Sequence, residues 1–467
     1  MQTNTRELVL DILLTLERGE GFSNQIIRSV LDKYDYLDGR DKAFIKRVAE
    51  GTIERQIELD YYLNQFSSVS VRKMKPLIRC LLRMSAYQLL YLDAVPDSAV
   101  CNEACKLAEK RKFRNLKGFV NGVLRNLAKQ KDNLPLPDRE KGEVPYLSVK
   151  YSVPEWMVEL WLREYGKEIV ETLLEGLLQI HPVSIRFRTD LEEGERERIL
   201  HEMKAQGVKA QKSAYLPYLY TLQNVEGVQI LPGFEEGAFA VQDVSSALAV
   251  EAAGIGSEDF VIDVCAAPGG KSILAAEKAD KVLSRDVSES KVELIGENLE
   301  RMQINNIITQ VYDATQTDET YRDQADVVLM DVPCSGLGVL GKKRDIKYHA
   351  SPESLSEITR LQREIISHSW QYVKPGGILL YSTCTIHRAE NEEMVQWILD
   401  NFPFEPVTLD EELPEKLKEQ REIVQDARSK DSVEKADEEV QRACVQMLPG
   451  YMKADGFFFA KLRRKDV

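Results

Sequence analysis

The chain has 467 residues, of which 43% are hydrophobic and 30% charged, with a mean hydropathy of −0.33. This composition excludes collagen-like, mucin-like and wholly disordered proteins, and no run of about 18 apolar residues predicts a membrane span. Arg6, Glu7 and Asp11 interrupt the N-terminal segment where a signal peptide needs an apolar stretch. Seven cysteines in so long a chain indicate a reducing compartment rather than a disulfide scaffold, so we expect a cytoplasmic protein.

The charge is distributed unevenly along the chain. Residues 1–130 contain 22 basic and 16 acidic side chains, a net charge of +6, and the other residues contain 40 basic and 60 acidic side chains, a net charge of −20. A basic module fused to an acidic body predicts that the first third meets a polyanion. A merely solvated surface has the same composition, so charge alone leaves both interpretations open.

Residues 1–133 are predicted to form an all-α domain. Leu8, Ile12 and Leu16 recur at helical spacing, and strand-like alternation is absent. Cys101 and Cys105 lie one helical turn apart and are expected to pack in a core. The segment 111–129 combines an apolar face with a basic one, which suits either a solvated helix or a phosphate-contacting helix. Its basic residues include Arg111, Lys112, Arg114, Lys117 and Arg125.

Three motifs in this domain resemble the NusB-like domain, an RNA-binding helical bundle of bacteria. They are LLRMSAYQLLYLDAVP at 81–96, AVCNEACKLAEK at 99–110 and KGFVNGVLRNL at 117–127. The resemblance implies that residues 1–133 form such a bundle and bind RNA.

A linker and a small mixed segment follow the helical domain. Pro135, Pro137 and Pro145 mark the linker. Within residues 146–235, a helix is predicted near Pro154, and VSIRFRT and YLYTLQ have the character of strands. We expect a small α+β segment here that links the domains and recognises RNA.

Residues 236–467 alternate short apolar runs with helical stretches. The runs of strand length are FVIDVCAA, KVLSRD, ITQVYD, DVVLMDVP and GILLYSTC. This alternation predicts a Rossmann-like α/β domain with a parallel, doubly wound sheet that binds ligands at the carboxyl ends of its strands. Residues 405–440 hold 13 acidic and 6 basic residues and no aromatic residue. They are expected to form an exposed helix or a poorly ordered insertion.

The first of these strands runs into a glycine-containing loop, CAAPGGKS, that precedes a helix. A nucleotide-phosphate loop would need glycine at position 265, which is Cys265, and Pro268 removes a backbone N–H from such a loop. The alternative ligand is S-adenosylmethionine, whose ribose needs hydrogen-bond acceptors. Asp286 ends the next strand, where a carboxylate can accept from both ribose hydroxyls, and Asp313 ends the third strand, beside the adenine. Capping of the following helices is the alternative role for each aspartate.

Two further strands end in cysteines, Cys334 after Asp331 and Pro333, and Cys384 after Thr383. If these strands are neighbours, about 4.8 Å separates their axes, and a base fits between two thiols. Methylation at cytosine C5 needs such an arrangement, because C5 becomes nucleophilic only after a thiolate has added at C6. A lone strand-end cysteine is more often a small buried hydrophobe.

A free thiol with a pKa of about 8.5 is only about 3% ionised at neutral pH, so the attacking cysteine needs a cation or a helix N-terminus nearby. Lys271 and a helix starting after Thr385 are the candidates. We assign Asp331 to cytosine N3, protonated or bridged by Lys271. A zinc site of Cys334, Cys384 and His387 lacks an obvious fourth ligand. Three acidic residues are expected in the first turn of a helix, where negative charge is favourable: Glu390, Glu392 and Glu393.

The segments DVCAAPGGKS, DVPCSGLGVLGKKRDIKY, KPGGILLYSTCTIHRAENEE and DGFFFAKLRR together resemble the NOL/NOP/Sun family of RNA cytosine-C5 methyltransferases. The resemblance implies that Cys384 is the nucleophile and that Cys334 assists product release. It also implies a set of residues that contact the cofactor. These are Cys265, Ala266, Ala267, Pro268, Gly269, Gly270, Lys271, Asp286, Asp313 and Asp331.

With the NusB-like domain, the resemblance implies a bacterial enzyme that uses S-adenosylmethionine to make 5-methylcytosine in 16S rRNA. We expect a monomer with no membrane partner and no metal. The domains are expected at 1–133, 146–235 and 236–467. Two rival functions remain, a DNA cytosine methyltransferase and a non-enzymatic rRNA-binding assembly factor. The NusB-like domain argues against the first, and the intact pair of cysteines against the second.

Overall fold

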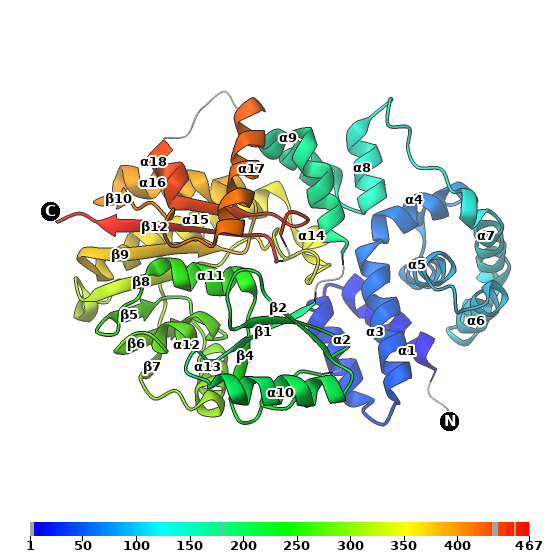
Figure 1. Ribbon diagram of the computed structural model, residues 1–467. Coiled ribbons are helices and arrows are strands. Elements are labelled where there is room, and N and C mark those ends of the chain that lie inside the picture. Colours follow the sequence, from blue (N-terminus) through cyan, green and yellow to red (C-terminus); the bar gives the residue numbers. More distant parts are fainter. Residues whose placement is uncertain (1–3, 180–181, 226, 432–437, 453, 467) are drawn as a thin grey trace. The chain divides into compact units, whose positions relative to one another are not determined.

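The computed structural model describes residues 4–179, 182–225, 227–431, 438–452 and 454–466. The chain divides into two compact units, one of Met1–Arg163 with Lys342–His349 and one of Glu164–Gly341 with Ala350–Val467. Figure 1 labels their helices and strands. We call them unit 1 and unit 2 and describe each by itself. In the part of the chain that the structure describes, no helix is both long and apolar enough to cross a membrane.

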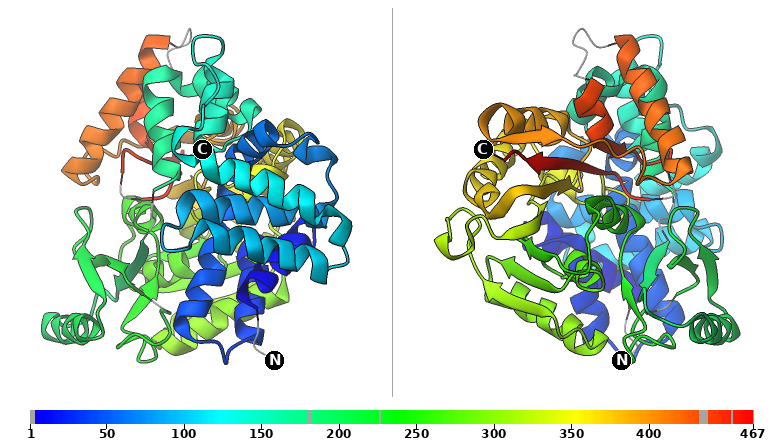
Figure 2. Two further views of the ribbon diagram at one scale, coloured as in Figure 1. Left: turned by 90° about the vertical axis from the view of Figure 1, so that its right-hand side faces the viewer. Right: turned by 60° about the vertical axis from the view of Figure 1, so that its left-hand side comes forward.

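Unit 1 is a helical bundle, as the sequence predicts (Figure 2, left). Asn4 and Asp38 cap the first and third helices by accepting hydrogen bonds from backbone N–H groups, and Pro76 opens the fifth. The helices are α1 (Thr5–Glu17), α2 (Ser23–Lys33), α3 (Gly39–Glu54), α4 (Gln56–Phe66), α5 (Pro76–Tyr91), α6 (Asp97–Lys110), α7 (Lys117–Gln130), α8 (Glu143–Tyr151) and the first part of α9 (Glu155–Leu177).

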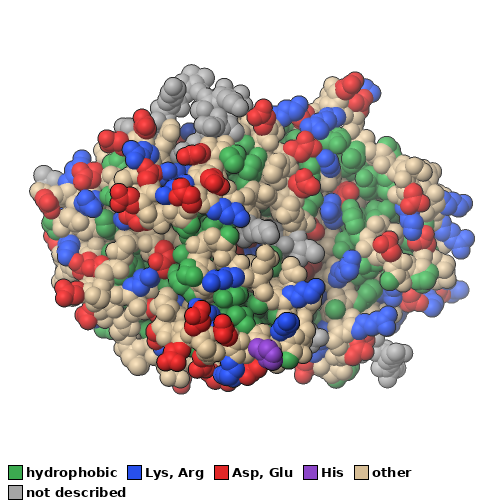
Figure 3. Space-filling model, viewed as in Figure 1, with side chains coloured by type: hydrophobic (Ala, Val, Ile, Leu, Met, Phe, Trp, Pro, Cys, Tyr) green, Lys and Arg blue, Asp and Glu red, His purple; other side chains and the backbone are tan. Residues whose placement is uncertain are grey.

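Helix α5 forms the centre of the bundle and contacts α1, α3, α4, α6 and α7. Its close approach to α3 requires Gly51, because a Cβ atom there would lie 2.0 Å from the ring of Tyr87. Cys101 and Cys105 are buried, as expected. Helix α7 buries Val120, Leu124 and neighbouring apolar side chains. Its opposite face exposes basic side chains, which are visible with those of α6 as blue atoms in Figure 3.

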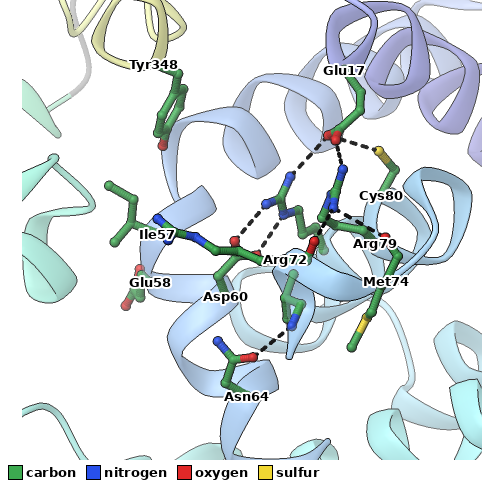
Figure 4. Close-up of polar contacts among 12 residues, drawn as sticks. Glu17, Ile57, Glu58, Asp60, Asn64, Arg72, Met74, Arg79, Cys80 and Tyr348 are labelled. Atoms are coloured by element: carbon green, nitrogen blue, oxygen red, sulfur yellow. Dashed lines mark hydrogen bonds and ion pairs between the residues drawn. The ribbon is translucent and has the colours of Figure 1, made fainter. Parts of the chain in front are cut away.

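A cluster of charged side chains joins three helices of unit 1 (Figure 4). Arg83 of α5 donates two hydrogen bonds of 2.7 Å to the carboxylate of Asp60 in α4. Glu17 at the end of α1 accepts from Arg79 and Arg83. Burial raises the pKa of the adjacent Cys80 thiol to about 11, so this thiol stays protonated. Glu17, Cys80 and Arg83 line a cavity of about 280 Å³ together with Tyr348 and other residues.

Residues 342–349 follow Cys334 in the sequence but belong to unit 1. They include the short helix α14 (Ile346–His349). The guanidinium of Arg344 lies 2.9 Å from Glu54 of α3, and the Lys347 ammonium donates to the carbonyl oxygen of the same residue. The Tyr348 hydroxyl donates to the carbonyl oxygen of Ile53. No motif in the sequence predicts this attachment.

A small antiparallel sheet in unit 2 confirms the α+β prediction for the middle of the chain. Its strands are β1 (Val183–Phe187), β2 (Lys209–Lys212), β3 (Leu219–Gln223) and β4 (Phe239–Val241), in the order β2-β3-β1-β4. Helix α10 (Glu193–Ala205) packs Ile199 and Met203 against Phe187 and Phe239 of this sheet.

The large sheet of unit 2 has the order β10-β12-β9-β8-β5-β6-β7. Strand β5 has β6 on one side and β8 on the other, all three parallel, so the direction of winding reverses at β5. In doubly wound sheets, ligands bind at the carboxyl ends of the strands that flank such a reversal, here β5 and β8. The strands are β5 (Phe260–Asp263), β6 (Lys281–Asp286), β7 (Ile307–Val311), β8 (Ala325–Asp331), β9 (Val373–Thr383), β10 (Phe404–Pro406), β11 (Cys444–Met447) and β12 (Phe457–Arg464).

The sheet is mixed rather than wholly parallel, which differs from the sequence prediction. The final strand β12 runs antiparallel to β9 and to β10 and lies between them, with β11 paired to part of it. The side chains of Phe458 and Phe459 point to opposite faces of the sheet, and both are fully buried. The alternation of strands and helices in the sequence predicts the parallel strands up to β9. It contains no signal that a later strand, β12, inserts beside β9.

Helices lie on both faces of this sheet (Figure 2, right). They are α11 (Val244–Ala253), α12 (Gly270–Ala276), α13 (Glu289–Met302), α15 (Pro352–Ser369), α16 (Glu392–Asn401), α17 (Glu415–Asp431) and α18 (Glu438–Ala443). The acidic segment is not simply an exposed helix. Leu409, Leu413 and Leu417 are buried in a core of unit 2, and Arg421 pairs with Asp410. Residues 432–437 of this segment lie outside the described residues.

Candidate active site

The glycine-containing loop connects β5 to α12 at the carboxyl end of β5. Gly269 has φ +99°, and a Cβ atom there would meet the side chain of Ile295 at 3.2 Å, so a side chain is strained at this position. The backbone N–H of Ala266 donates to the carbonyl oxygen of Arg285 in β6. The loop therefore lies against the end of β6, with its backbone close to the neighbouring elements.

Asp286 ends β6 beside this loop and is 5% exposed. Its carboxylate accepts hydrogen bonds from the backbone N–H groups of Ala267 and Val287, and Lys291 lies 3.0 Å away. Asp313 follows the end of β7 and is exposed. Its Oδ1 atom accepts from the backbone and the hydroxyl of Thr315, and these hydrogen bonds lower the pKa of Asp313. Both aspartates thus also bind backbone N–H groups nearby.

Lys271 and Asp331 form an ion pair of 2.6 Å between the start of α12 and the end of β8. Burial alone would lower the pKa of Lys271, but the Asp331 carboxylate raises it above its ordinary value, and the charge of Cys384 contributes in the same direction. The Ser382 hydroxyl donates to the other oxygen of Asp331 at 2.9 Å. The ammonium group therefore stays charged at the edge of the sheet where the cysteine loops begin.

A further carboxylate, Asp263, lies at the end of β5 and is completely buried. Its Oδ2 atom accepts from the Ser272 hydroxyl, whereas Oδ1 has no hydrogen-bond partner among the described residues. Burial raises its pKa to about 7. No motif in the sequence singles out this residue, although its place at the end of the strand before the loop is a usable signal. An unsatisfied buried oxygen beside strained glycine backbone fits a polar ligand such as S-adenosylmethionine.

The two strand-end cysteines lie side by side. Strands β8 and β9 are parallel neighbours, with Asp331 opposite Ser382. The Sγ atoms of Cys334 and Cys384 are 3.1 Å apart, and the backbone N–H of Cys384 points to Cys334 Sγ at 3.3 Å. Both residues are partly exposed. Burial also raises the pKa of the Cys265 thiol in the loop after β5, so this thiol stays protonated.

Two expectations about the segment after Cys384 are wrong. The helix expected directly after Thr385 begins only at Glu392, after a short 3-10 turn, η6 (Arg388–Glu390). No helix N-terminus therefore follows Cys384 directly, which leaves Lys271 as the candidate cation. Glu390 does not lie in the first turn of α16 but in η6, fully buried. Only Glu392 and Glu393 occupy that first turn.

His387 does not join the two cysteines in a metal site. Its Nδ1 atom lies 2.8 Å from a carboxylate oxygen of Glu164, in the part of α9 that belongs to unit 2. The structure, over the residues it describes, contains no group of three or more His, Cys, Asp and Glu side chains arranged to bind a metal ion.

Comparison with known proteins gives matches along most of the chain. The model of the 16S rRNA methyltransferase RsmB/F matches residues 254–463, that of the NusB family matches residues 3–129, and that of the RsmF/B-like ferredoxin-like domain matches residues 153–229. A curated relative from Bacillus subtilis, "Probable ribosomal RNA small subunit methyltransferase B", is 34% identical over 99% of each chain.

Solved structures show the same fold. The structure titled "Crystal Structure of PH0851" has a TM-score of 0.77 at 23% identity and covers 99% of this chain and 100% of its own. A "Methyltransferase Homolog Protein" from Pyrococcus horikoshii has a TM-score of 0.55 at 22% identity and covers 68% of this chain and 97% of its own.

The full-length relative and the family models agree with the all-α, α+β and α/β parts described above. The RsmB/F methyltransferases use S-adenosylmethionine, which confirms the cofactor predicted from the glycine-containing loop. The chain belongs to the 16S rRNA methyltransferase RsmB/F family.

Proposed function

We propose that this rRNA methyltransferase modifies C5 of one cytosine in 16S rRNA through a covalent bond between Cys384 and C6, and that Cys334 assists product release. The observation that best supports this proposal is the 3.1 Å separation of the two sulfurs at the ends of neighbouring strands. Methylation of a ring nitrogen or a ribose oxygen needs no thiol, whereas methylation at C5 needs a nucleophile at C6.

In the proposed reaction, Cys384 Sγ forms a bond to C6 and the electron pair of the C5–C6 double bond makes C5 nucleophilic. When bound, S-adenosylmethionine would supply an electrophilic methyl group for C5, and the electron pair of the broken methyl–sulfur bond would remain on the sulfur of the departing S-adenosylhomocysteine. Loss of the C5 proton to a base returns an electron pair to the ring, and the Sγ–C6 bond breaks with its pair on sulfur. Cys334 lies beside Cys384, and we assign it to this last step, in which the C5 proton is lost and the product is released from Cys384.

The charges around the thiols support this division of roles. The hydrogen bond to Cys384, burial, and the charges of Cys384, Glu390 and Asp331 all raise the pKa of Cys334 well above its ordinary value. The Lys271 ammonium favours negative charge on Cys384. We place the pair of Lys271 and Asp331 at N3 of the cytosine, where it withdraws charge from the ring.

We further propose that the loop and strand ends bind the cofactor. Asp286 is assigned to the ribose hydroxyls and Asp313 to the adenine, and Lys271 and Asp331 complete the site. The loop residues are Cys265, Ala266, Ala267, Pro268, Gly269 and Gly270. The strained backbone at Gly269 and the buried carboxylate of Asp286 support this placement.

The remaining assignments concern the domains and the partner. We propose that residues 1–133 and 146–235 bind the RNA and that residues 236–467 perform the chemistry on a base turned out of its stack. The exposed basic side chains of α7 support the first assignment. We propose a monomer that acts in the cytoplasm, where rRNA is found.

The test is a comparison of methyl acceptors. The purified protein is incubated with S-adenosylmethionine carrying a labelled methyl group and with 16S rRNA, 23S rRNA or DNA, and products are mapped by bisulfite sequencing. One protected cytosine in 16S rRNA is the expected result. A label at another atom, or equal labelling of DNA, contradicts the proposal. Binding of RNA without any methyl transfer supports an assembly factor.

A further inference from the structure

A fully buried carboxylate lies directly behind the two cysteine loops and has no part in the chemistry assigned above. Glu390 in η6 is 0% exposed. Its Oε2 atom accepts from the backbone N–H of Ser335 and from the Gln362 amide, each at 2.9 Å, and its Oε1 atom accepts from the Ser335 hydroxyl at 2.5 Å. All three contacts are made by groups that donate to a carboxylate.

These contacts reach the residues on both sides of Cys334. Ser335 follows Cys334 directly in the sequence. Gln362, from α15, also donates to the carbonyl oxygen of Pro333, the residue before Cys334, at 2.9 Å. We call the residues around Pro333 and Cys334 the Pro-Cys loop and the residues around Thr383 and Cys384 the Thr-Cys loop. Hydrogen bonds therefore connect the backbone of the Pro-Cys loop to Glu390 directly at Ser335 and through Gln362 at Pro333.

The same group of contacts includes the loop that bears Cys384. The hydroxyls of Ser335 and Thr385 lie 2.8 Å apart, so the residues that follow the two cysteines are bonded to each other. The Tyr381 hydroxyl donates to the carbonyl oxygen of Glu390 at 2.6 Å. The next residue, Asn391, donates to the carbonyl oxygen of Thr385 at 3.1 Å. The Glu390 carboxylate thus reaches the loop of Cys334 directly and the loop of Cys384 through Ser335 and Thr385, and its hydrogen bonds with Ser335 and Gln362 include neither sulfur.

We propose that Glu390 is a positioning residue that fixes the Pro-Cys loop against the Thr-Cys loop and so sets the separation of the two thiols. The inference rests on the proposed function and deepens it. A buried charge is costly unless several donors surround it, and here three converge on one carboxylate. Glutamine at this position keeps the shape but turns an amide N–H₂ toward one of these donors, which breaks part of the arrangement.

The charge of Glu390 also acts on Cys334. Burial raises the pKa of Glu390, while the hydrogen bonds from Ser335 and Gln362 and the charge of His387 oppose this shift. The titratable groups that act on Cys334 are Cys384 and Tyr381 from β9 and the loop after it, Asp331 from β8, and Glu390 from η6. The positive charge near these groups is that of Lys271, which forms an ion pair with Asp331. Removing the Glu390 charge removes repulsion against a Cys334 thiolate, so this thiol should ionise at lower pH.

The experiment compares Glu390→Gln and Ser335→Ala with the control Glu393→Gln, which changes an exposed carboxylate of α16. The alkylation rates of Cys334 and Cys384 by iodoacetamide are followed from pH 6 to pH 10 by peptide mass spectrometry. In parallel, kcat and the KM for S-adenosylmethionine are measured on 16S rRNA. Alkylation reports the geometry and ionisation of the loops without any need for turnover.

We expect Glu390→Gln to move the alkylation profile of Cys334 to lower pH and to lower kcat at least tenfold, with KM for S-adenosylmethionine within twofold. Ser335→Ala, which keeps its backbone N–H, should lower kcat by a smaller factor. The control should leave all three quantities unchanged.

The proposal is overturned if, in Glu390→Gln, the alkylation rate of Cys334 at every pH and kcat both stay within twofold of the values for the parent protein. If Glu390→Gln does not fold, Ser335→Ala decides, and an unchanged kcat with an unchanged profile overturns the proposal. If the parent protein makes no 5-methylcytosine but Glu390→Gln still shifts the profile, the proposed function fails and the positioning role stands.

Discussion

The Sγ atoms of Cys334 and Cys384 lie 3.1 Å apart although 50 positions separate these residues in the sequence. The parallel pairing of β8 with β9 brings them together, because both strands end at the same edge of the sheet. A pyrimidine ring cannot fit between sulfurs at this distance. It must therefore approach both from one side, or the loops must separate when the base enters.

Alanine substitution of each cysteine should have opposite effects on a covalent intermediate. Cys384→Ala should abolish turnover and all covalent RNA adduct, because no thiol is left to attack C6. Cys334→Ala should instead accumulate the adduct, because addition still occurs but release is slowed. Denaturing gel electrophoresis with labelled RNA measures both outcomes. An adduct that forms with Cys384→Ala and not with Cys334→Ala reverses the assignment.

Gly269→Ala should weaken cofactor binding and destabilise unit 2 by about 1–3 kcal/mol, because the new Cβ requires strained backbone at φ +99° and meets Ile295. Gly296→Ala is the matched control, since this glycine lies inside α13 with open space around it. The control should stabilise the protein by up to about 1 kcal/mol. Thermal unfolding and calorimetric titration with S-adenosylmethionine measure both effects, and equal affinity in the two variants contradicts the placement of the cofactor.

The ion pair of His387 with Glu164 should stabilise unit 2 more at low pH. Burial lowers the pKa of His387, but the hydrogen bond to Glu164 and the negative charges of Glu164, Glu390 and Glu393 together outweigh burial and raise the pKa above its ordinary value. The charged imidazole is thus favoured in the folded state, and its contribution is complete below the unfolded pKa and lost as the pH rises through the folded pKa.

Glu164→Gln should therefore lower the free energy of unfolding by about 1–2 kcal/mol more at pH 6 than at pH 8.5. His201→Gln, at an exposed histidine of α10, is the control and should show no such pH dependence. Thermal unfolding at the two pH values tests the prediction, and a loss equal at both contradicts it.

Lys347 should make the stability of unit 1 depend on pH with the opposite sign, so that stability increases as the pH rises. Burial lowers its pKa to about 7, whereas an unfolded lysine titrates near 10.5. Between these values the unfolded chain binds more protons than the folded one, so stability increases as the pH rises from 7 to 10. Lys347→Met should remove this increase, because it leaves no group to titrate. Calorimetric unfolding at pH 7 and pH 9 measures the slope, and an unchanged slope in the variant contradicts the prediction.

The sequence alone determined the division into helical, mixed and α/β parts, the glycine-containing loop and the strand-end residues Asp286, Asp331, Cys334 and Cys384. Local periodicity fixes which segments become strands, and the parallel strands of an α/β sheet present their carboxyl ends at one edge. Residues at those ends can therefore be grouped without knowledge of the structure.

Only the tertiary structure decided the place of β12 beside β9, the attachment of residues 342–349 to unit 1 and the burial of Glu390 between the cysteine loops. Each depends on contacts between segments far apart in the chain, which no local pattern encodes. Glu390 shows the limit most clearly. The same glutamate is a solvated helix cap or a buried hydrogen-bond acceptor according to whether Ser335 and Gln362, 55 and 28 positions away, pack against it.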